Sequence, residues 1–192
     1  MAQIWFSADL HFNHNREFVY KLRGFDSVEE MNEAIVERFN KTISSDDTLY
    51  ILGDLCLGGG SEEMLEENKR LISSLNGHLK IVLGNHDTNN RIKMYSEGKN
   101  VEVIGYADLI KYNGYHFYLS HYPTITTNLD DSKSLKQRVL NLYGHTHQKA
   151  SFYNDNPTMY HVGVDSHNCY PILFDSIIER MKEKVEECIV YL

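Results

Sequence analysis

The sequence predicts an α/β fold. Short runs of β-branched and aromatic residues recur along the chain, and segments with one apolar helical face separate the first three of these runs. Alternation of strand and helix at the start indicates parallel βαβ units. The second half has more strands and fewer helices, which indicates a more mixed sheet, and a final amphipathic helix closes the chain.

The strands are predicted from apolar runs with β-branched and aromatic side chains. These runs cover residues 3–8, 48–52, 79–83, 101–106, 115–120, 139–143 and 159–164. Helices are predicted over residues 27–42, 61–75 and 175–187. The first and the last contain Ser-x-x-Glu capping boxes, formed by Ser27 with Glu30 and by Ser176 with Glu179. Each helix places its apolar residues on one face, as expected for a helix packed on a sheet.

Composition indicates one globular domain over residues 1–192, because 42% of the residues are apolar and 24% are charged. The 19 basic and 27 acidic side chains give a net charge of −8. An acidic surface repels a phosphate backbone, so we expect no stable binding of duplex DNA. A small phosphorylated substrate, such as a nucleotide, is compatible with this charge if bound divalent ions reverse the local field.

The location is predicted to be cytoplasmic. The 3 cysteines are too few for a disulfide framework, and none lies in a Cys-x-x-Cys pair. The first residues lack a basic region followed by a long apolar stretch, so no signal peptide is expected. No apolar run is long enough to cross a membrane.

Polar residues follow five of the predicted strands, at the point where each strand ends. These segments are Asp9-Leu10-His11, Gly53-Asp54, Gly84-Asn85-His86-Asp87, His121 and Gly144-His145-Thr146-His147. Ligands of open α/β sheets bind outside the carboxyl ends of the strands, so we expect these side chains to meet at one sheet edge. Because side chains alternate along a strand, the Asp-x-His and His-x-His pairs each point to one side. The preceding glycines allow the backbone to turn and approach closely.

The residue types indicate a metal site. Carboxylate, imidazole and amide oxygen form the mixed ligand set that suits Mn²⁺, Fe²⁺ or Zn²⁺, whereas structural zinc sites use thiolates. Each motif alone is also typical of a cap or a turn. Their joint occurrence, each at the end of an apolar run, carries the prediction.

This constellation resembles the calcineurin-like metallophosphoesterase superfamily, and its compact bacterial and phage members in particular. That resemblance implies two facing mixed β-sheets, a β-sandwich core, flanked by α-helices. It also implies two divalent ions, with Mn²⁺ favoured over Fe²⁺, Ni²⁺ or Zn²⁺. The implied metal ligands are Asp9, His11, Asp54, Asn85, His121, His145 and His147, with Asp54 bridging the two ions.

The resemblance further implies that metal-bound hydroxide attacks phosphorus in a phosphodiester or phosphomonoester, a diester being favoured. His86 would protonate the leaving group or stabilise the transition state, and Asp87 would orient His86 by accepting a hydrogen bond from its ring. His14 and Arg16 are candidate substrate contacts, with a surface loop pair as the alternative. Asp165 is a candidate partner of a metal ligand.

Two other functions were weighed against hydrolysis of a small substrate. A silent scaffold or binding module that keeps this fold would be expected to have lost ligands, and all of them are present here. A nuclease would need a basic groove or an added DNA-binding domain. The segment after Asp54 also lacks the Asp and Arg of protein phosphatases and the Tyr of purple acid phosphatases.

Overall fold

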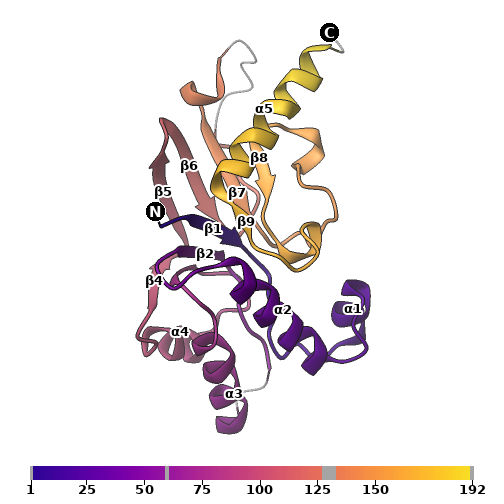
Figure 1. Ribbon diagram of the computed structural model, residues 1–192, viewed down its shortest axis with the longest axis vertical. Coiled ribbons are helices and arrows are strands. Elements are labelled where there is room, and N and C mark those ends of the chain that lie inside the picture. The colour runs from indigo at the N-terminus through magenta and orange to yellow at the C-terminus, as the bar shows by residue number, and fades with distance from the viewer. Residues whose placement is uncertain (1, 59–60, 127–132, 191–192) are drawn as a thin grey trace.

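The computed structural model describes residues 2–58, 61–126 and 133–190. Two β-sheets pack against each other, and helices cover the outer face of the first (Figure 1). The strands are β1 Ile4–Ser7, β2 Thr48–Leu52, β3 His78–Val82, β4 Val101–Gly105, β5 Ala107–Tyr112, β6 Tyr115–Ser120, β7 Val139–Tyr143, β8 Met159–His161 and β9 Ile172–Leu173. The helices are α1 Glu17–Tyr20, α2 Val28–Thr42, α3 Glu62–Ser73, α4 Asn89–Ser96 and α5 Phe174–Val190. Short 3₁₀ turns are η1 Lys21–Arg23, η2 Leu135–Gln137, η3 Tyr153–Asp155 and η4 Val164–Ser166.

Both sheets are mixed, as the resemblance implied. The first has 5 strands in the order β4-β3-β2-β1-β9, with β1 to β4 parallel and β9 antiparallel to β1. The second has 4 strands in the order β5-β6-β7-β8, in which only β5 runs antiparallel to its neighbour. The predicted parallel first half and mixed second half are therefore confirmed.

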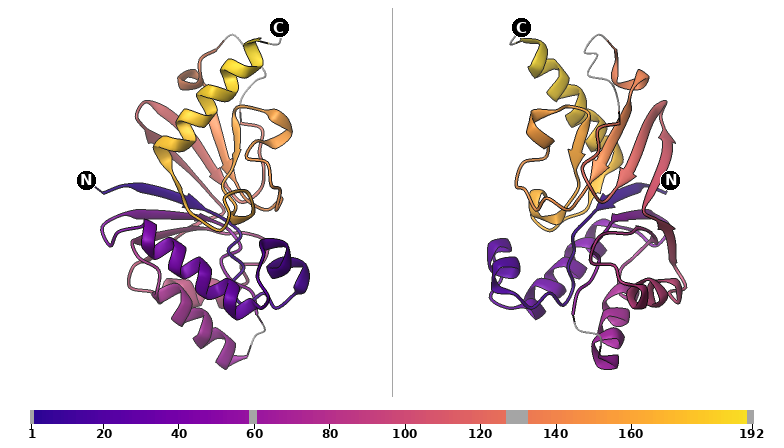
Figure 2. Two further views of the ribbon diagram at one scale, coloured as in Figure 1. Left: turned by 45° about the vertical axis from the view of Figure 1, so that its right-hand side comes forward. Right: turned by 180° about the vertical axis from the view of Figure 1, so that it is seen from behind.

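The first sheet is buried on both faces, and its side chains alternate between two apolar clusters. Leu49 and Ile51 of β2 pack in the cluster that α2, α3 and α4 cover, whereas Tyr50 and Leu52 face the second sheet. In both views of Figure 2 the purple and magenta helices lie on one side of these strands and the orange strands on the other. Phe174 of α5 packs against Phe6 of β1, with ring centroids 4.8 Å apart. The sheets are therefore joined through a continuous apolar layer.

The predicted helices form, with one correction at a helix start. Ser27 caps α2, its hydroxyl accepting a hydrogen bond from the Glu30 amide at 3.1 Å. The last helix begins at Phe174, so Ser176 lies inside its first turn and is not the N-cap. Phe174 packs edge-on against Phe117 of β6 at 4.6 Å, and this aromatic contact accompanies the earlier start.

Four elements were not predicted: β5, β9, α1 and α4. The exposed and half-buried side chains of β5 do not alternate as an apolar strand, because it lies at a sheet edge. β9 and α1 are too short to show a period. The predicted strand over residues 159–164 ends at His161, because Val164 begins η4.

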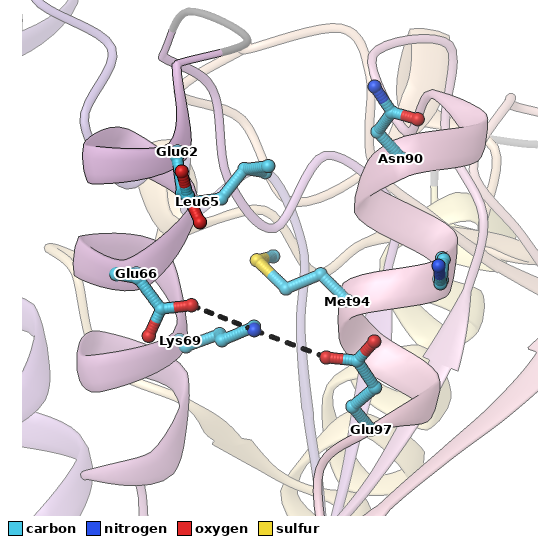
Figure 3. A pocket seen from close by; sticks show the side chains of 8 residues that line it. Glu62, Leu65, Glu66, Lys69, Asn90, Met94 and Glu97 are labelled. Atoms are coloured by element: carbon cyan, nitrogen blue, oxygen red, sulfur yellow. Dashed lines mark hydrogen bonds and ion pairs between the residues drawn. The ribbon is translucent and has the colours of Figure 1, made fainter.

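A shallow hollow separates α3 from α4 on the outer layer (Figure 3). The Lys69 ammonium bridges it, lying 2.9 Å from a Glu66 carboxylate oxygen and 3.1 Å from one of Glu97. Exposed ion pairs of this kind contribute little to stability. No predicted site residue lines this hollow. Among the described residues, no helix is long and apolar enough to cross a membrane, and the cytoplasmic location stays a prediction.

Candidate metal centre

The predicted ligands come together, but from two sheets and not from one sheet edge. Asp9, Asp54 and Asn85 follow β1, β2 and β3 of the first sheet. His121 follows β6, and His145 follows β7, of the second sheet. Parallel strands end on the same side within each sheet, and the face-to-face packing brings the two sets of strand ends together. The centre therefore lies where the two sheets meet.

Five of the seven expected ligands have a left-handed backbone conformation, which corrects the reason given for the shared orientation of the Asp-x-His and His-x-His pairs. φ is 56° at Asp9, 53° at His11, 53° at Asp54, 67° at His145 and 48° at His147. None of these residues lies on an extended strand, so the strand period does not orient the pairs. Asp and His tolerate this conformation better than most residues, although it costs free energy and is concentrated at functional sites.

One group of donor atoms comes from Asp9, His11 and His147. The Nε2 atoms of His11 and His147 lie 3.1 Å apart, and each lies 4.0 Å from Asp9 Oδ1. Asp9 Oδ2 accepts a hydrogen bond from the His145 amide at 2.9 Å, whereas the buried Oδ1 has no partner. His147 Nδ1 bonds to Asp165 Oδ2 at 2.8 Å, so in the neutral ring Nε2 carries the lone pair.

A second group of donor atoms comes from Asp9, Asp54 and His121, and Asn85 lies beside His121. His121 Nδ1 donates to the Leu52 carbonyl oxygen at 2.9 Å, which leaves the Nε2 lone pair facing Asn85 Oδ1 at 2.9 Å and Asp54 Oδ2 at 3.4 Å. Asp54 Oδ2 also lies 3.8 Å from His11 Nε2. Asp54 Oδ2 thus lies near a histidine of each group, and Asp9 contributes to both groups. The role of Asp54 as the bridging ligand stays a prediction.

His145 is the exception among the expected ligands. Its ring lies 5.0 Å from the His121 ring, between centroids, but its nitrogens belong to neither close group of donor atoms. It is exposed, so a change of rotamer would not disturb the core. Its role as a ligand stays a prediction.

The donor set fits divalent cations. Several lone-pair atoms face one another at short distance, and such an arrangement needs a proton or a cation between them. Asp9 Oδ1 is buried without a hydrogen bond, which is costly unless a cation binds it. Imidazole and carboxylate together suit Mn²⁺, Fe²⁺, Ni²⁺ or Zn²⁺.

The charges of the centre shape its titration. Burial raises the pKa of Asp9 to about 6, despite the opposing influence of His147 and His121. Burial would also raise the pKa of Asp54, but hydrogen bonding and charge from His121 lower it to about 2. Burial would lower the pKa of His147, but its hydrogen bond to Asp165 and the charges of Asp9 and Asp165 together raise it. A cation entering the centre therefore competes with bound protons.

Asp87 does not orient the His86 ring, contrary to the prediction. Asp87 Oδ2 accepts hydrogen bonds from the amides of Gly84 at 2.7 Å and Asp54 at 3.1 Å, and Oδ1 accepts one from the Tyr95 hydroxyl at 2.8 Å. These bonds occupy the buried carboxylate and tie the turn after β2 to the turn after β3. Asp87 therefore positions the Asp54 backbone, and its partner Tyr95 was not identified from the sequence.

His86 stands beside the centre without joining either group of donors. Its side chain is 43% exposed, and its Nε2 lies 3.9 Å from Asp54 Oδ2. Arg91 holds its backbone, donating to the His86 carbonyl oxygen and, at 2.7 Å, to the Gly58 carbonyl oxygen. This placement agrees with a role next to the metals, which stays a prediction.

Asp165 and Arg23 hold two of the expected ligands in position through hydrogen bonds. Arg23 donates to both Asp165 oxygens, at 3.0 and 2.9 Å, and to the backbone carbonyl of Asp9 at 2.8 Å. Its side chain is 1% exposed. Arg23 therefore links the β1 turn to the partner of His147, and no local sequence signal marked it.

Two glycines are required by close packing at the centre. Gly53 has φ of +89°, and a Cβ there would clash with the His121 ring. A Cβ on Gly144 would lie 2.6 Å from both Ala8 Cβ and Asp9 Oδ2. The close backbone approach predicted for these positions is confirmed.

The two candidate substrate contacts differ. His14 lines a pocket beside the centre, and its ring centroid lies 5.2 Å from that of His11. Arg16 is exposed at the start of α1, and its guanidinium makes no hydrogen bond or ion pair with the described residues. A contact between Arg16 and substrate stays a prediction.

The chain is similar to known proteins over nearly its whole length. The family model of the calcineurin-like phosphoesterase superfamily domain matches residues 3–189. An uncharacterized protein of Methanocaldococcus jannaschii is 30% identical over 187 residues, covering 95% of this chain and 93% of that protein. The Gene 66 protein of Mycobacterium phage L5 is 26% identical over 190 residues, covering 86% and 88%.

A crystal structure of a protein of unknown function from Aquifex aeolicus has the same fold. It superposes with a TM-score of 0.69 at 24% identity, covering 93% of this chain and 99% of that one. The chain belongs to the calcineurin-like phosphoesterase superfamily, which confirms the resemblance seen in its motifs.

Proposed function

We propose that this protein is a phosphoester hydrolase that uses two divalent metal ions and acts on small phosphodiesters of the nucleotide type. The observation that carries the proposal is the position of Asp54 Oδ2, which lies 3.4 Å from His121 Nε2 and 3.8 Å from His11 Nε2. The Asp54 carboxylate thus lies near a histidine of each group, and Asp9 belongs to both groups. Asp9, His11 and His147 would hold one ion, and Asn85, His121 and His145 the other, with Asp54 shared.

Bound ions would supply an activated water and neutralise charge on the phosphoryl oxygens. The side chains of this chain would do the rest. The hydroxyl of the water would add to phosphorus while the bond from phosphorus to the leaving oxygen breaks. His86 Nε2 would give that oxygen a proton, and the proton released by the attacking water would balance the reaction. The exposure of His86 allows it to meet a substrate that enters from solvent.

The charge around the centre supports a diester as the substrate. A monoester is a dianion near neutral pH, and sites for it usually present unpaired arginines. Arg23 is neutralised by Asp165 and turned toward the backbone, and Arg91 is held by carbonyl oxygens. A diester carries one negative charge and two organic groups, so it does not require either of these two arginines. Mn²⁺ is the proposed metal, with Fe²⁺, Ni²⁺ and Zn²⁺ as alternatives.

Hydrolysis of bis-p-nitrophenyl phosphate and p-nitrophenyl phosphate tests the proposal. Metal-stripped protein should be inactive and should regain turnover on addition of Mn²⁺. Asp54→Asn and His86→Ala should each lose turnover by about a hundredfold or more. His116→Ala, which changes an exposed histidine on β6, is the matched control and should retain activity.

The ratio of the turnover rates on the two substrates shows whether diester or monoester hydrolysis is preferred. If the protein binds metal but hydrolyses neither substrate with any of the four ions, the alternative of a silent scaffold is favoured. If turnover persists in Asp54→Asn, the assignment of the bridging ligand is wrong.

A further inference from the structure

A pocket of about 540 Å³ opens directly beside the metal centre. Its lining includes His11, His86 and His147 of the centre, together with Phe18, Leu22 and Lys149. Its size is in the range of pockets that enclose a small organic ligand. Its lining residues include members of α1, which lies at the right-hand side of Figure 1, and of the segment that follows β7.

The α1 and η1 segment presents two large apolar side chains to this pocket. Phe18 is 66% exposed and Leu22 is 72% exposed, and they lie four positions apart, so they share one face. Val19 and Tyr20, between them, are buried in the core beneath α2 and anchor the segment. The exposed face is therefore held in place by its own buried side, and it is unfavourable in water.

His14 connects the apolar wall to the metal centre. Its ring packs edge-on against Phe18, with centroids 5.8 Å apart, and lies 5.2 Å from the ring of His11. Because rings line the path from a metal ligand to Phe18, one ligand can place phosphorus at the centre and its organic group on the wall. Planar rings stack well on such aromatic surfaces.

The charge of the pocket favours an anionic ligand. Lys149 lies on the rim, with its ammonium 3.5 Å from the Leu22 carbonyl oxygen. Within the described parts of the chain, no carboxylate lies within ion-pair distance of this ammonium. The nearby Asp165 carboxylate is already paired with Arg23. The pocket thus combines an apolar face with one cation that no acid neutralises.

We propose that this pocket binds the organic group of the phosphoester, and that this group carries a planar aromatic ring that packs on Phe18 and Leu22. The inference rests on the proposed function, since it concerns the same substrate. A nucleobase and a simple aryl group share this chemistry. Phe18 and Leu22 would then determine specificity without touching the reacting atoms.

Competitive inhibition by matched phosphonates tests the inference. Phenylphosphonate and methylphosphonate differ by the aromatic ring, and neither can be hydrolysed at its phosphorus–carbon bond. Phenylphosphonate should bind Mn²⁺-loaded protein at least tenfold more tightly than methylphosphonate. Phe18→Ala and Leu22→Ala should each weaken phenylphosphonate by about 3- to 30-fold and leave methylphosphonate within about twofold.

Leu109→Ala is the matched control, because Leu109 is 68% exposed on β5, outside the pocket. It should change neither inhibition constant. Comparing the inhibition constants of AMP and ribose 5-phosphate distinguishes the two sources of the ring. Tighter binding of AMP that Phe18→Ala removes indicates a nucleobase. Equal binding of AMP and ribose 5-phosphate indicates an aryl group. Equal binding of the two phosphonates, or equal weakening of both in the variants, would overturn the inference.

The experiment distinguishes failure of this inference from failure of the proposed hydrolysis. If wild-type protein hydrolyses no ester, calorimetric binding of the same two phosphonates to Mn²⁺-loaded protein replaces inhibition. If phenylphosphonate then binds tenfold more tightly than methylphosphonate and Phe18→Ala abolishes the difference, the pocket still binds the aromatic ring as proposed. Normal turnover with no such preference would refute the pocket and leave the proposed hydrolysis intact.

Discussion

Replacing Asp165 with Asn tests how the chain supports its metal centre. The Asp165 carboxylate accepts hydrogen bonds from Arg23 Nε at 3.0 Å, Arg23 Nη2 at 2.9 Å and His147 Nδ1 at 2.8 Å. An amide has one acceptor oxygen in place of two and carries no charge. Asp165→Asn therefore leaves the Arg23 guanidinium buried without a counter-charge and removes the hydrogen-bond partner of His147 or of Arg23.

The expected loss is large for one substitution. Removing one partner of a buried ion pair costs about 3–5 kcal/mol, a large share of the roughly 5–15 kcal/mol that stabilises a typical domain. For a chain of this length the melting temperature should fall by about 6–20 °C. Losing the hydrogen bond that orients a ligand histidine should also weaken Mn²⁺ binding by about 10- to 100-fold.

Urea unfolding of the metal-free protein measures the first effect, and calorimetric Mn²⁺ titration the second. Asp155→Asn is the matched control: its carboxylate pairs with Lys184 at 2.9 Å on the surface, where an ion pair is worth less than about 1 kcal/mol. If Asp165→Asn costs no more than Asp155→Asn, the buried ion pair does not support the centre and the reasoning is refuted.

Three further predictions concern the same region. Burial raises the pKa of Asp9 to about 6, so a metal ion must displace a proton from Asp9 below that pH. The Mn²⁺ affinity should therefore fall by up to about tenfold per pH unit below about pH 6. A calorimetric Mn²⁺ affinity that stays constant between about pH 5 and 8 would contradict this. Removing the metal with EDTA should lower the melting temperature by about 5–11 °C if the ion was present at about a hundred times its dissociation constant, and an unchanged value would mean that the native fold does not bind it. Tyr95→Phe should cost about 1–3 kcal/mol of unfolding free energy, because the buried Asp87 carboxylate loses a donor, whereas the exposed Tyr106→Phe should cost almost nothing; equal effects would argue against the assigned role of Asp87.

The local pattern of apolar residues was sufficient to predict most of the strands and helices. The strands of β2, β6 and β7 match their predicted bounds, because an apolar run that ends in Gly, Asp or His marks both burial and its end. The elements that were missed are short or lie at an edge, as β5 does, where burial leaves little imprint on the sequence.

Relationships between distant residues were not predictable in this way. Arg23 and Asp165 are 142 positions apart, and nothing near either residue indicates the other. Asp87 was expected to serve its neighbour His86, but the turns after β2 and β3 pack so closely that backbone amides occupy it. Such partners depend on three-dimensional packing, which periodicity does not encode.

The sequence by itself determined the class of fold and the identities of the candidate ligands, because side-chain chemistry and the ends of apolar runs are local properties. Only the tertiary structure decided that these ligands come from two sheets and that five of them lie on left-handed turns. It also decided that Phe18 and Leu22 face a pocket beside them. The physical reason is that convergence of side chains depends on how separate elements pack, and packing free energy is shared among residues far apart in the chain.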